Sequence, residues 1–273
     1  SSLLKADGKK IGFVPTMGFL HKGHLSLIKE SKKKSDITVV SIFVNPAQFA
    51  PNEDLEKYPR DFERDKTLLL EEKIDYLFFP DAKEIYPENF KTYVEVSGVT
   101  KMFEGEIRPS HFKGVTTIVN ILFNIIKPDY AFFGQKDAQQ SVVIKKMVRD
   151  LKMDIEVIVC PVIREEDGLA MSSRNVYLSK EEREKALLLS KTIFEARELI
   201  NLGERDTAKI IKKVNNNFLR EKTIHLNYLN IVEAESFNQI ETMEEGKEYF
   251  IIIAAKVGST RLIDNVLIFL NNK

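Results

Sequence analysis

Two histidines, His21 and His24, stand three residues apart in a chain that has only four. They follow the apolar run of residues 10–16, so the segment predicts a turn from a strand into a helix, with both imidazoles near the helix N-terminus. Backbone N–H groups and the helix dipole favour a phosphate there, and the imidazoles could donate hydrogen bonds to a phosphoryl group as its charge increases. The alternatives are a helix start with incidental histidines, or half of a zinc site. The other histidines and Cys160 stand at no spacing typical of zinc ligands, which disfavours the metal.

A second candidate segment is GLAMSSRN, residues 168–175. The hydroxyl groups of Ser172 and Ser173 and the guanidinium of Arg174 follow one another in a predicted loop, with Gly168 as a pivot. Together they could bind a polyphosphate, for which arginine is the stronger multidentate partner. Taken alone, the tripeptide is more typical of a serine-rich linker. In either case we expect Arg174 to be exposed.

The elements that must position these residues alternate between strand and helix over the first two-thirds of the chain. Short β-branched apolar runs predict buried parallel strands, and amphipathic runs predict the helices between them. The expected strands are residues 10–16, 36–44, 74–80, 129–134 and 155–160, and the expected helices are 24–34, 59–73, 115–127 and 137–151. This alternation predicts a doubly wound α/β domain with a mainly parallel sheet, in which ligands bind beyond the carboxyl ends of the strands.

The pattern changes after Arg174. Ser179 and Glu182 predict a capping box at the start of a long charged helix. A second helix over residues 207–219 and strands over 224–232, 248–257 and 260–270 are expected to follow. We therefore predict two domains, residues 1–174 and a smaller α+β domain of residues 175–273.

Composition narrows the function classes. The chain has 41 basic and 41 acidic side chains among 273 residues, so charge does not favour a nucleic-acid partner. No apolar stretch approaches the ~20 residues that span a membrane, and residues 115–126 are expected to form a buried helix. Cys160 has no second cysteine to pair with, which favours a reducing compartment, the cytoplasm. We see no signal peptide, and the sequence begins without an initiator methionine.

The H-x-G-H turn after the first strand and the basic hydroxyl loop after the last one together resemble the HIGH and KMSKS signatures of the nucleotidyl-transfer superfamily, whose members bind ATP between these elements. Narrower motifs are similar to those of the pantoate–β-alanine ligase (pantothenate synthetase) family. They are PTMGFLHKGHLSLI, FVNPAQF, YPRDFERD, RPSHFKGV, FGQKDAQQ and DGLAMSSRNVYLS. Their common order makes the match specific over about residues 10–179, and the remainder matches in outline.

The sequence departs from the family pattern at two places. The family has a lead-in helix before the first strand, and we expect this helix to be truncated here. Ile121 stands where the family has a lysine, at a position to which the resemblance assigns no catalytic role.

The resemblance implies an ATP site of three segments. His24 matches the proton donor, and His21, Lys136 and Arg174 match the other catalytic positions, with Lys136 placed to reach phosphate oxygens. Ile163 falls where a backbone contact to adenine is expected. The implied ATP-binding residues are Met17, Gly18, Phe19, Leu20, His21, Lys22, Gly23, His24, Gly134, Gln135, Lys136, Asp137, Ile163, Met171, Ser172, Ser173 and Arg174.

Gln48 and Gln140 match two glutamines that hold pantoate in the family, and Gln48 also lies near the β-alanine site. A neutral amide suits a hydroxy acid because it can donate to one oxygen and accept from a hydroxyl. Both residues have simpler interpretations. Gln140 could cap a helix together with Asp137, and Gln48 could be a solvated loop residue. His111 and Tyr58 could shape the pocket, although both are by default ordinary loop residues.

The resemblance implies a ligase that condenses pantoate with β-alanine in two steps. ATP first converts pantoate to pantoyl adenylate with release of pyrophosphate, and β-alanine then displaces AMP. We expect Mg²⁺ to be held mainly by the triphosphate, because the sequence has no evident carboxylate cage. The family also implies a homodimer.

Two rival hypotheses remain: a nucleotidyltransferase without an amine step, and a nucleotide-binding regulatory module with a decayed site. The intact His24, Lys136 and Arg174 argue against decay. Gln48 and Gln140 favour a small hydroxy acid as the second substrate.

Overall fold

The computed structural model describes residues 7–51, 53–219, 221 and 223–271. Contacts divide the chain into an N-terminal unit, Ser1–Gly134 with Gln139–Pro161, and a C-terminal unit, Gln135–Ala138 with Val162–Lys273. The expected lead-in helix falls before residue 7, outside the described residues. The domain limits 1–174 and 175–273 stay a prediction, since a division by contacts does not define independently folding domains.

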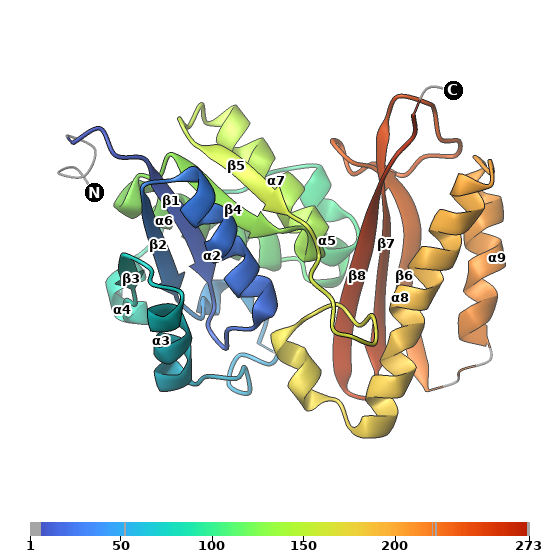
Figure 1. The fold of residues 1–273 in the computed structure, drawn as a ribbon, viewed down its shortest axis with the longest axis horizontal. Coiled ribbons are helices and arrows are strands. Elements are labelled where there is room, and N and C mark those ends of the chain that lie inside the picture. Colours follow the sequence, from blue (N-terminus) through green and yellow to red (C-terminus); the bar gives the residue numbers. More distant parts are fainter. Residues whose placement is uncertain (1–6, 52, 220, 222, 272–273) are drawn as a thin grey trace. The chain divides into compact units, whose positions relative to one another are not determined.

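A five-stranded parallel sheet forms the centre of the N-terminal unit (Figure 1). Its strands are β1 (Ile11–Thr16), β2 (Ile37–Ile42), β3 (Tyr76–Phe78), β4 (Tyr130–Gly134) and β5 (Glu156–Cys160), in the order β3-β2-β1-β4-β5. β1 and β2 are almost entirely buried, as expected of apolar runs in a parallel sheet. Thr16 pairs with Ile42, so the carboxyl ends of these two strands lie at the same edge. The predicted doubly wound α/β fold is confirmed.

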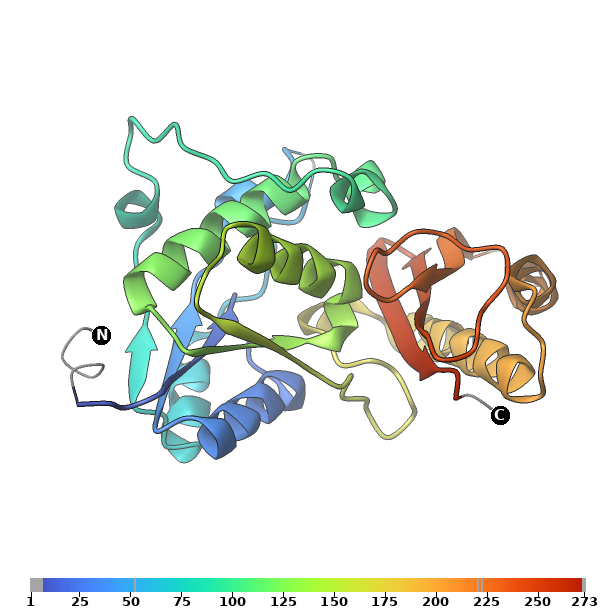
Figure 2. The same cartoon turned by 90° about the horizontal axis from the view of Figure 1, so that it is seen from above.

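Helices cover both faces of this sheet. α2 (Lys22–Lys34) and α3 (Phe62–Glu71) lie on one face, and α6 (His111–Ile126) and α7 (Ala138–Asp150) lie on the other (Figure 2). α6 is the expected buried helix, but it begins at His111, four residues earlier than the sequence pattern indicated. The first turn forms because His111 and Phe112 are themselves buried, a property that periodicity does not show.

Short elements that the sequence did not predict connect the longer ones. They are α4 (Ala82–Ile85), α5 (Glu104–Ile107), and the 3₁₀ helices η1 (Pro46–Gln48), η2 (Val99–Lys101), η3 (Gln135–Asp137) and η4 (Ser173–Tyr177). Each is only a turn or so long, too short for an apolar repeat to be recognised in sequence. Ser173 and Arg174, which were expected in a loop, begin η4, and Ser172 precedes it as the N-cap residue.

The C-terminal unit is the expected smaller α+β arrangement. Its helices are α8 (Lys180–Asn201) and α9 (Thr207–Leu219), and its strands are β6 (Ile224–Glu233), β7 (Glu248–Val257) and β8 (Thr260–Phe269). The strands form an antiparallel sheet in the order β6-β7-β8. Leu189, Ile193 and Ala196 lie on one face of α8 and join a core with Ile251 and Ile253 of β7.

The capping box at the start of α8 is present. The Ser179 hydroxyl accepts the N–H of Glu182 at 3.2 Å, and Glu182 Oε2 accepts the N–H of Ser179 at 2.8 Å. No helix in the described part of the chain combines the length and apolarity that crossing a bilayer requires.

Candidate active site

The turn from β1 into α2 has an unusual backbone. Gly18 has φ +82°, and a Cβ at this position would lie 3.1 Å from both Asp65 Oδ2 and Ile42 Cγ2. Phe19 has φ +51°, which is uncommon for a residue with a side chain. The Asp65 carboxylate accepts the N–H groups of Phe19 at 2.6 Å and Leu20 at 2.7 Å. The strained backbone at Phe19 is thus stabilised by a hydrogen bond to Asp65. Strain of this kind is typical of ligand-binding turns.

Asp65 is 1% exposed, although it carries a carboxylate. Burial raises its pKa, against the two backbone N–H groups and the guanidinium of Arg64 that favour its charged form. Arg64 also donates to the carbonyl of Leu20 at 2.9 Å and lies 5.1 Å from the Phe19 ring centroid. The start of α3 therefore fixes the turn from one side. Because the Leu20 side chain is fully buried and its N–H and C=O are bonded, this predicted ATP residue contributes to the frame of the turn.

His21 and His24 cap α2 with their own imidazoles. His21 is the N-cap residue, and its Nδ1 accepts the N–H of Gly23 at 3.1 Å. His24 Nδ1 accepts the N–H of His21 at 3.3 Å, and the two ring centroids lie 4.0 Å apart. A ring nitrogen that accepts a hydrogen bond carries no proton, so the neutral form of each ring has its proton on Nε2. Both side chains are held as Nε2–H donors beside a helix N-terminus, where a phosphate is favoured.

Gln48 is not a solvated loop residue, because it is only 8% exposed. It ends η1, which follows the carboxyl end of β2. Its Oε1 accepts from Asn45 Nδ2 at 3.1 Å, and its Nε2 donates to Met17 Sδ at 3.0 Å. The structure thus brings a predicted pantoate residue next to the predicted ATP turn.

α6 packs closely against η1, which carries Gln48, at Gly114. A Cβ on Gly114 would lie 2.2 Å from the carbonyl oxygen of Ala47, so only glycine allows η1 to approach so closely. Asn45 Nδ2 donates to the Gly114 carbonyl at 3.0 Å, and Asn45 Oδ1 accepts from the Tyr86 hydroxyl at 2.8 Å. The amide of Asn45 is therefore oriented by partners on both sides, and it fixes which end of the Gln48 amide faces it.

The backbone carbonyl of Gln48 accepts from two side chains, the buried His111 and the half-buried Arg108. His111 Nδ1 donates to it at 3.0 Å and Arg108 Nη2 at 3.2 Å, while Arg108 pairs with both oxygens of Glu53 at 2.6 Å. Burial and the nearby Arg108 charge lower the pKa of His111 to about 4. Burial alone would raise the pKa of Glu53, but the hydrogen bonds and charge of Arg108 hold it below its usual value. The default interpretation of His111 as an ordinary loop residue is wrong.

Tyr58 lies in a loop, as expected by default, but its side chain is buried. It is 5% exposed, and its ring packs edge-on against Phe49 with a centroid distance of 6.0 Å. Cys160, at the end of β5, is buried as expected, and burial raises the pKa of its thiol to about 11. His225 lies exposed on β6.

Gln139 and Gln140 differ in how their amides are used. Gln139 is buried, donates to the carbonyls of Val99 and Met102 at 2.8 and 2.7 Å, and accepts the N–H of Glu104 at 3.0 Å. Gln139 is therefore structural. Gln140 is half-buried in the first turn of α7, and its role in pantoate binding stays a prediction.

Lys136 lies in η3, within the C-terminal unit. Its Nζ is 3.3 Å from Asp137 Oδ1. The carbonyls of Gln135 and Lys136 accept both amide hydrogens of Asn265, at 2.8 and 2.9 Å. This turn is consequently fixed by a strand near the C-terminal end of the chain.

The third predicted ATP segment follows the turn of a small hairpin. Ile163 accepts the N–H of Met171 at 2.9 Å, and Arg164 forms a bridge with Ala170. Gly168 closes the turn with φ +95°. The hairpin joins two predicted ATP residues, Ile163 and Met171, by a direct backbone hydrogen bond.

η4 follows the hairpin and carries the serine and arginine side chains. The Ser172 hydroxyl caps it by accepting the N–H of Arg174 at 3.2 Å, and Ser173 is buried. Arg174 was expected to be exposed, but it is half-buried. Asn175 Nδ2 donates to Glu165 Oε1 at 2.8 Å and thereby ties η4 to the hairpin.

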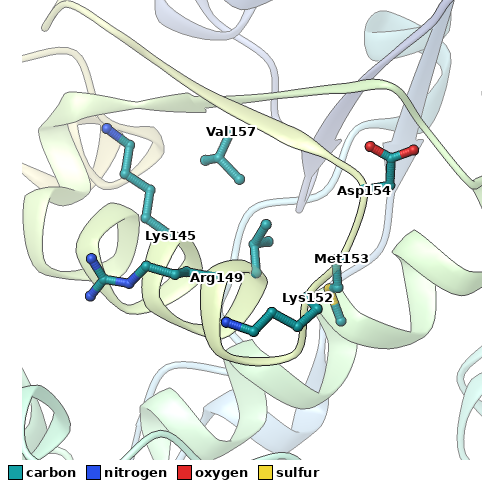
Figure 3. Close-up of a pocket in the computed structure, with 7 residues that line it drawn as sticks. Lys145, Arg149, Lys152, Met153, Asp154 and Val157 are labelled. Atoms are coloured by element: carbon teal, nitrogen blue, oxygen red, sulfur yellow. The ribbon is translucent and has the colours of Figure 1, made fainter.

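The predicted site residues divide between the two units. Met17–His24, Gln48, Gly134 and Gln140 belong to the N-terminal unit, and Gln135–Asp137, Ile163 and Met171–Arg174 belong to the C-terminal unit. None of them lines the cavity of about 600 Å³ in Figure 3, which basic side chains such as Lys145, Arg149 and Lys152 surround. Lys145 and Arg149 project from α7 into solvent, so we assign this cavity no part in the candidate site.

Sequence reasoning missed several residues that hold the site. Asp65 and Arg108 stand inside the motifs YPRDFERD and RPSHFKGV, so those motifs contained a signal for them. Asn265 stands in an apolar strand segment, TRLIDNVLIF, where the polar pair at its centre was the available signal. Within the described residues, no cluster of three or more His, Cys, Asp or Glu side chains is arranged to hold a metal ion.

Comparisons with known proteins agree on one family. The family model for pantoate-beta-alanine ligase matches residues 1–267. Pantothenate synthetase of Caldicellulosiruptor saccharolyticus is 54% identical over 265 residues, which are 97% of this chain and 94% of that protein. That of Acetivibrio thermocellus is 54% identical over 261 residues, 96% of this chain and 92% of that protein.

Solved structures give the same result. The pantothenate synthetase crystal structure from Thermus thermophilus superposes with a TM-score of 0.91 at 44% identity and covers 94% of this chain and 92% of that one. The pantoate-beta-alanine ligase from Francisella tularensis, complexed with beta-gamma ATP and beta-alanine, has a TM-score of 0.77 at 35% identity and covers 97% and 93%. The chain belongs to the pantoate–β-alanine ligase family.

Proposed function

We propose that this protein condenses pantoate with β-alanine at the expense of ATP, through a pantoyl adenylate. A carboxylate oxygen of pantoate attacks the α-phosphorus of ATP, and the bond from that phosphorus to the β-phosphate oxygen breaks to release pyrophosphate. The β-alanine amine then attacks the acyl carbon, the bond to the AMP oxygen breaks, and the amine loses a proton to solvent. The observation that carries the proposal is the pair of Nε2–H imidazole donors, His21 and His24, at the start of α2.

His24 donates to an α-phosphate oxygen as charge increases there, and His21 holds the neighbouring phosphates. Their hydrogen bonds through Nδ1 keep the Nε2 protons in place without any rearrangement during the reaction. The helix N-terminus and the N–H groups of the turn add a favourable potential for the triphosphate.

Lys136 and Arg174 neutralise phosphate charge, and the hydroxyls of Ser172 and Ser173 add hydrogen bonds. Ile163 contacts adenine through its backbone. A guanidinium binds phosphate oxygens in a multidentate manner, whereas an ammonium acts as a point charge, so the two residues are not interchangeable. The complex of the Francisella relative with an ATP compound and beta-alanine supports these substrates for the present chain.

Gln48 and Gln140 orient pantoate, and Gln48 also faces β-alanine. The burial of Gln48 and its contact with Met17 support this role, because the amide is fixed next to the ATP turn. A neutral amide can bind the hydroxy acid without neutralising the carboxylate that must act as nucleophile.

We further propose that Mg²⁺ enters as the Mg–ATP complex, held mainly by the triphosphate. Family membership supports a homodimer, and the requirement for ATP supports a place in the cytoplasm. The domain limits 1–174 and 175–273 belong to the same set of proposals.

The test is pantoate-dependent exchange of labelled pyrophosphate into ATP in the absence of β-alanine. We expect exchange, because the acyl adenylate forms reversibly before the amine is needed. Exchange that strictly requires β-alanine would argue against a free adenylate. A nucleotidyltransferase without an amine step would show exchange but would form no amide when β-alanine is added, and a regulatory module would show neither.

A further inference from the structure

Two adjacent polar residues, Asp264 and Asn265, are buried in the middle of β8. They are 3% and 2% exposed, in a strand whose other residues are mostly apolar. Burying a carboxylate and an amide costs free energy unless hydrogen bonds compensate. Apolar residues of similar size often replace such groups without loss of stability, so stability alone is weak grounds for a polar pair here.

The side-chain amide of Asn265 makes three hydrogen bonds, all with the short segment Gln135–Lys136. Its Nδ2 donates to the carbonyls of Gln135 at 2.8 Å and Lys136 at 2.9 Å, and its Oδ1 accepts from Gln135 Nε2 at 3.1 Å. The two partners lie about 130 residues earlier in the sequence. η3 has no buried residue of its own, so these hydrogen bonds replace the apolar packing that would otherwise fix the turn.

Arg164 and Asp264 fix Asn265 in turn. The guanidinium of Arg164 pairs with both oxygens of Asp264, at 2.7 and 2.9 Å, and donates to the carbonyl of Asn265 at 3.3 Å. Asp264 Oδ1 also accepts the N–H of Asn265 at 2.7 Å. Arg164 lies 4.7 Å from the Phe194 ring of α8, which limits its movement.

The same arginine reaches the hairpin that precedes the Ser172–Arg174 segment. Arg164 Nη1 donates to the carbonyl of Gly168 at 3.0 Å. The ion pair between the half-buried Arg164 and the buried Asp264 thus supports the backbone of two predicted ATP segments within the C-terminal unit.

We propose that Asn265 is a positioning residue for adenylyl transfer and acts by holding the backbone of Lys136. The inference rests on the proposed role of Lys136 as a phosphate ligand. Removing the amide releases two carbonyls of η3, and the ammonium group then samples positions away from the phosphate. A misplacement of about 1 Å can cost roughly 100-fold in rate.

The first experiment compares Asn265→Ala with the wild type in pantoate-dependent pyrophosphate exchange. We expect the KM for ATP to rise about tenfold and kcat to fall by roughly 10- to 100-fold, with the KM for pantoate unchanged. A variant that was merely less stable would contain fewer active molecules, and its KM for ATP would stay at the wild-type value. Melting curves establish that the measured protein is folded.

Thr207→Val is the matched control. Thr207 is buried in the same unit, and its hydroxyl donates to the carbonyls of Ile240 and Glu241 at 2.6 and 3.1 Å, far in sequence from any predicted site residue. Its loss should lower the melting temperature about as much as Asn265→Ala while both KM values stay unchanged. A kinetic change in Thr207→Val equal to that of Asn265→Ala would overturn the inference.

A double-mutant cycle with Lys136→Ala separates the inference from the proposed function. If Asn265 acts through Lys136, Asn265→Ala should change the kinetics little further in the Lys136→Ala background. Near-normal exchange in Lys136→Ala alone would refute the role of Lys136. Two outcomes would refute only the positioning role of Asn265. One is slow exchange in Lys136→Ala with normal exchange in Asn265→Ala, and the other is full additivity of the two kinetic effects in the double variant.

If Asn265→Ala does not fold, one milder variant decides the question. Asn265→Asp keeps the shape and the acceptor for Gln135 but removes both amide donors. We expect the KM for ATP to rise in Asn265→Asp. Wild-type KM values in a folded Asn265→Asp variant would overturn the inference.

Discussion

The Gly18–His24 turn and the Gln135–Lys136 turn both follow strands of the same sheet, and both are assigned to ATP, yet they are held in different ways. In the first, the imidazole nitrogens of His21 and His24 accept N–H groups two or three residues away, so these predicted site residues cap their own helix. In the second, the backbone depends on Asn265, about 130 residues later in the chain. The first turn therefore carries its geometry in its own sequence, and the second acquires it only when the C-terminal unit folds.

The contrast between local and distant support is not complete. The first turn also needs Asp65, 46 residues further on, which accepts the N–H of Phe19. The Ser172–Arg174 segment is intermediate, with a local cap at Ser172 and a tie from Asn175 to Glu165. Substitutions can measure how much each predicted ATP segment depends on residues near in the sequence and how much on distant ones.

The largest effect is expected for His24, where capping and donation can be separated. His24→Asn keeps an acceptor near the position of Nδ1 for the His21 N–H but has no group at Nε2. We expect a folded protein whose kcat for adenylation is ~10²–10³ lower, because one preorganised donor to the phosphate is lost. Exposed His225→Asn is the control. Near-normal adenylation in a folded His24→Asn variant would sink the catalytic assignment and leave His24 as a helix cap.

Asp65 tests the distant support of the first turn. Asp65→Ala leaves the buried N–H groups of Phe19 and Leu20 without this acceptor, which should cost about 1–3 kcal/mol in the free energy of unfolding and raise the KM for ATP. Asp61 is the N-cap residue of α3, the helix that contains Asp65, and its side chain accepts the N–H of Arg64. Asp61→Ala should lower the free energy of unfolding by about 1 kcal/mol without changing the KM for ATP. Denaturant unfolding and exchange kinetics check both. Equal kinetics in the two variants would mean that the turn holds its shape without Asp65.

Arg174 tests the intermediate segment. Arg174→Ala should raise the KM for ATP about tenfold, since hydrogen bonds to a charged partner are worth about 1.5–3 kcal/mol. Arg174→Lys should recover only part of the affinity, because a lysine cannot bind in a multidentate manner. Lys185→Ala on the surface of α8 is the control. An unchanged KM for ATP in Arg174→Ala would remove this residue from the phosphate site.

The smallest effect is a pH dependence of stability at His111. The folded pKa of His111, about 4, lies below the ordinary histidine value of 6.5, so the unfolded chain binds the proton first as the pH falls. His111 therefore contributes stability that is present above pH 6.5 and is lost progressively between pH 6.5 and 4, with about 1.4 kcal/mol lost at pH 5.5.

The variant His111→Asn checks this contribution. Its amide can still donate to the Gln48 carbonyl but does not titrate, so its unfolding free energy should vary less with pH in this window. His225→Asn, at an exposed position of β6, shows how much the unfolding free energy varies with pH when an exposed histidine is removed. Parallel pH profiles for the wild type and His111→Asn would contradict a pKa lowered by burial, and the Gln48 support would then be insensitive to pH.

The sequence by itself determined the strands and long helices, the two-part α/β and α+β architecture, and the position of the histidine turn. α9 over Thr207–Leu219 and the capping box at Ser179 agree with the structure residue for residue. These features depend on apolar periodicity and on hydrogen bonds within a few residues, and both are present in the linear chain.

Only the tertiary structure decided how the site residues are supported. Three of the supporting contacts join residues 45 to 130 positions apart. Asp65 accepts the N–H of Leu20, His111 donates to the carbonyl of Gln48, and Asn265 donates to the carbonyl of Gln135. A polar side chain in a sequence has no evident partner until strands pair and helices pack around it. Whether it is solvated, structural or part of the site is settled by which buried groups then lie within hydrogen-bonding distance.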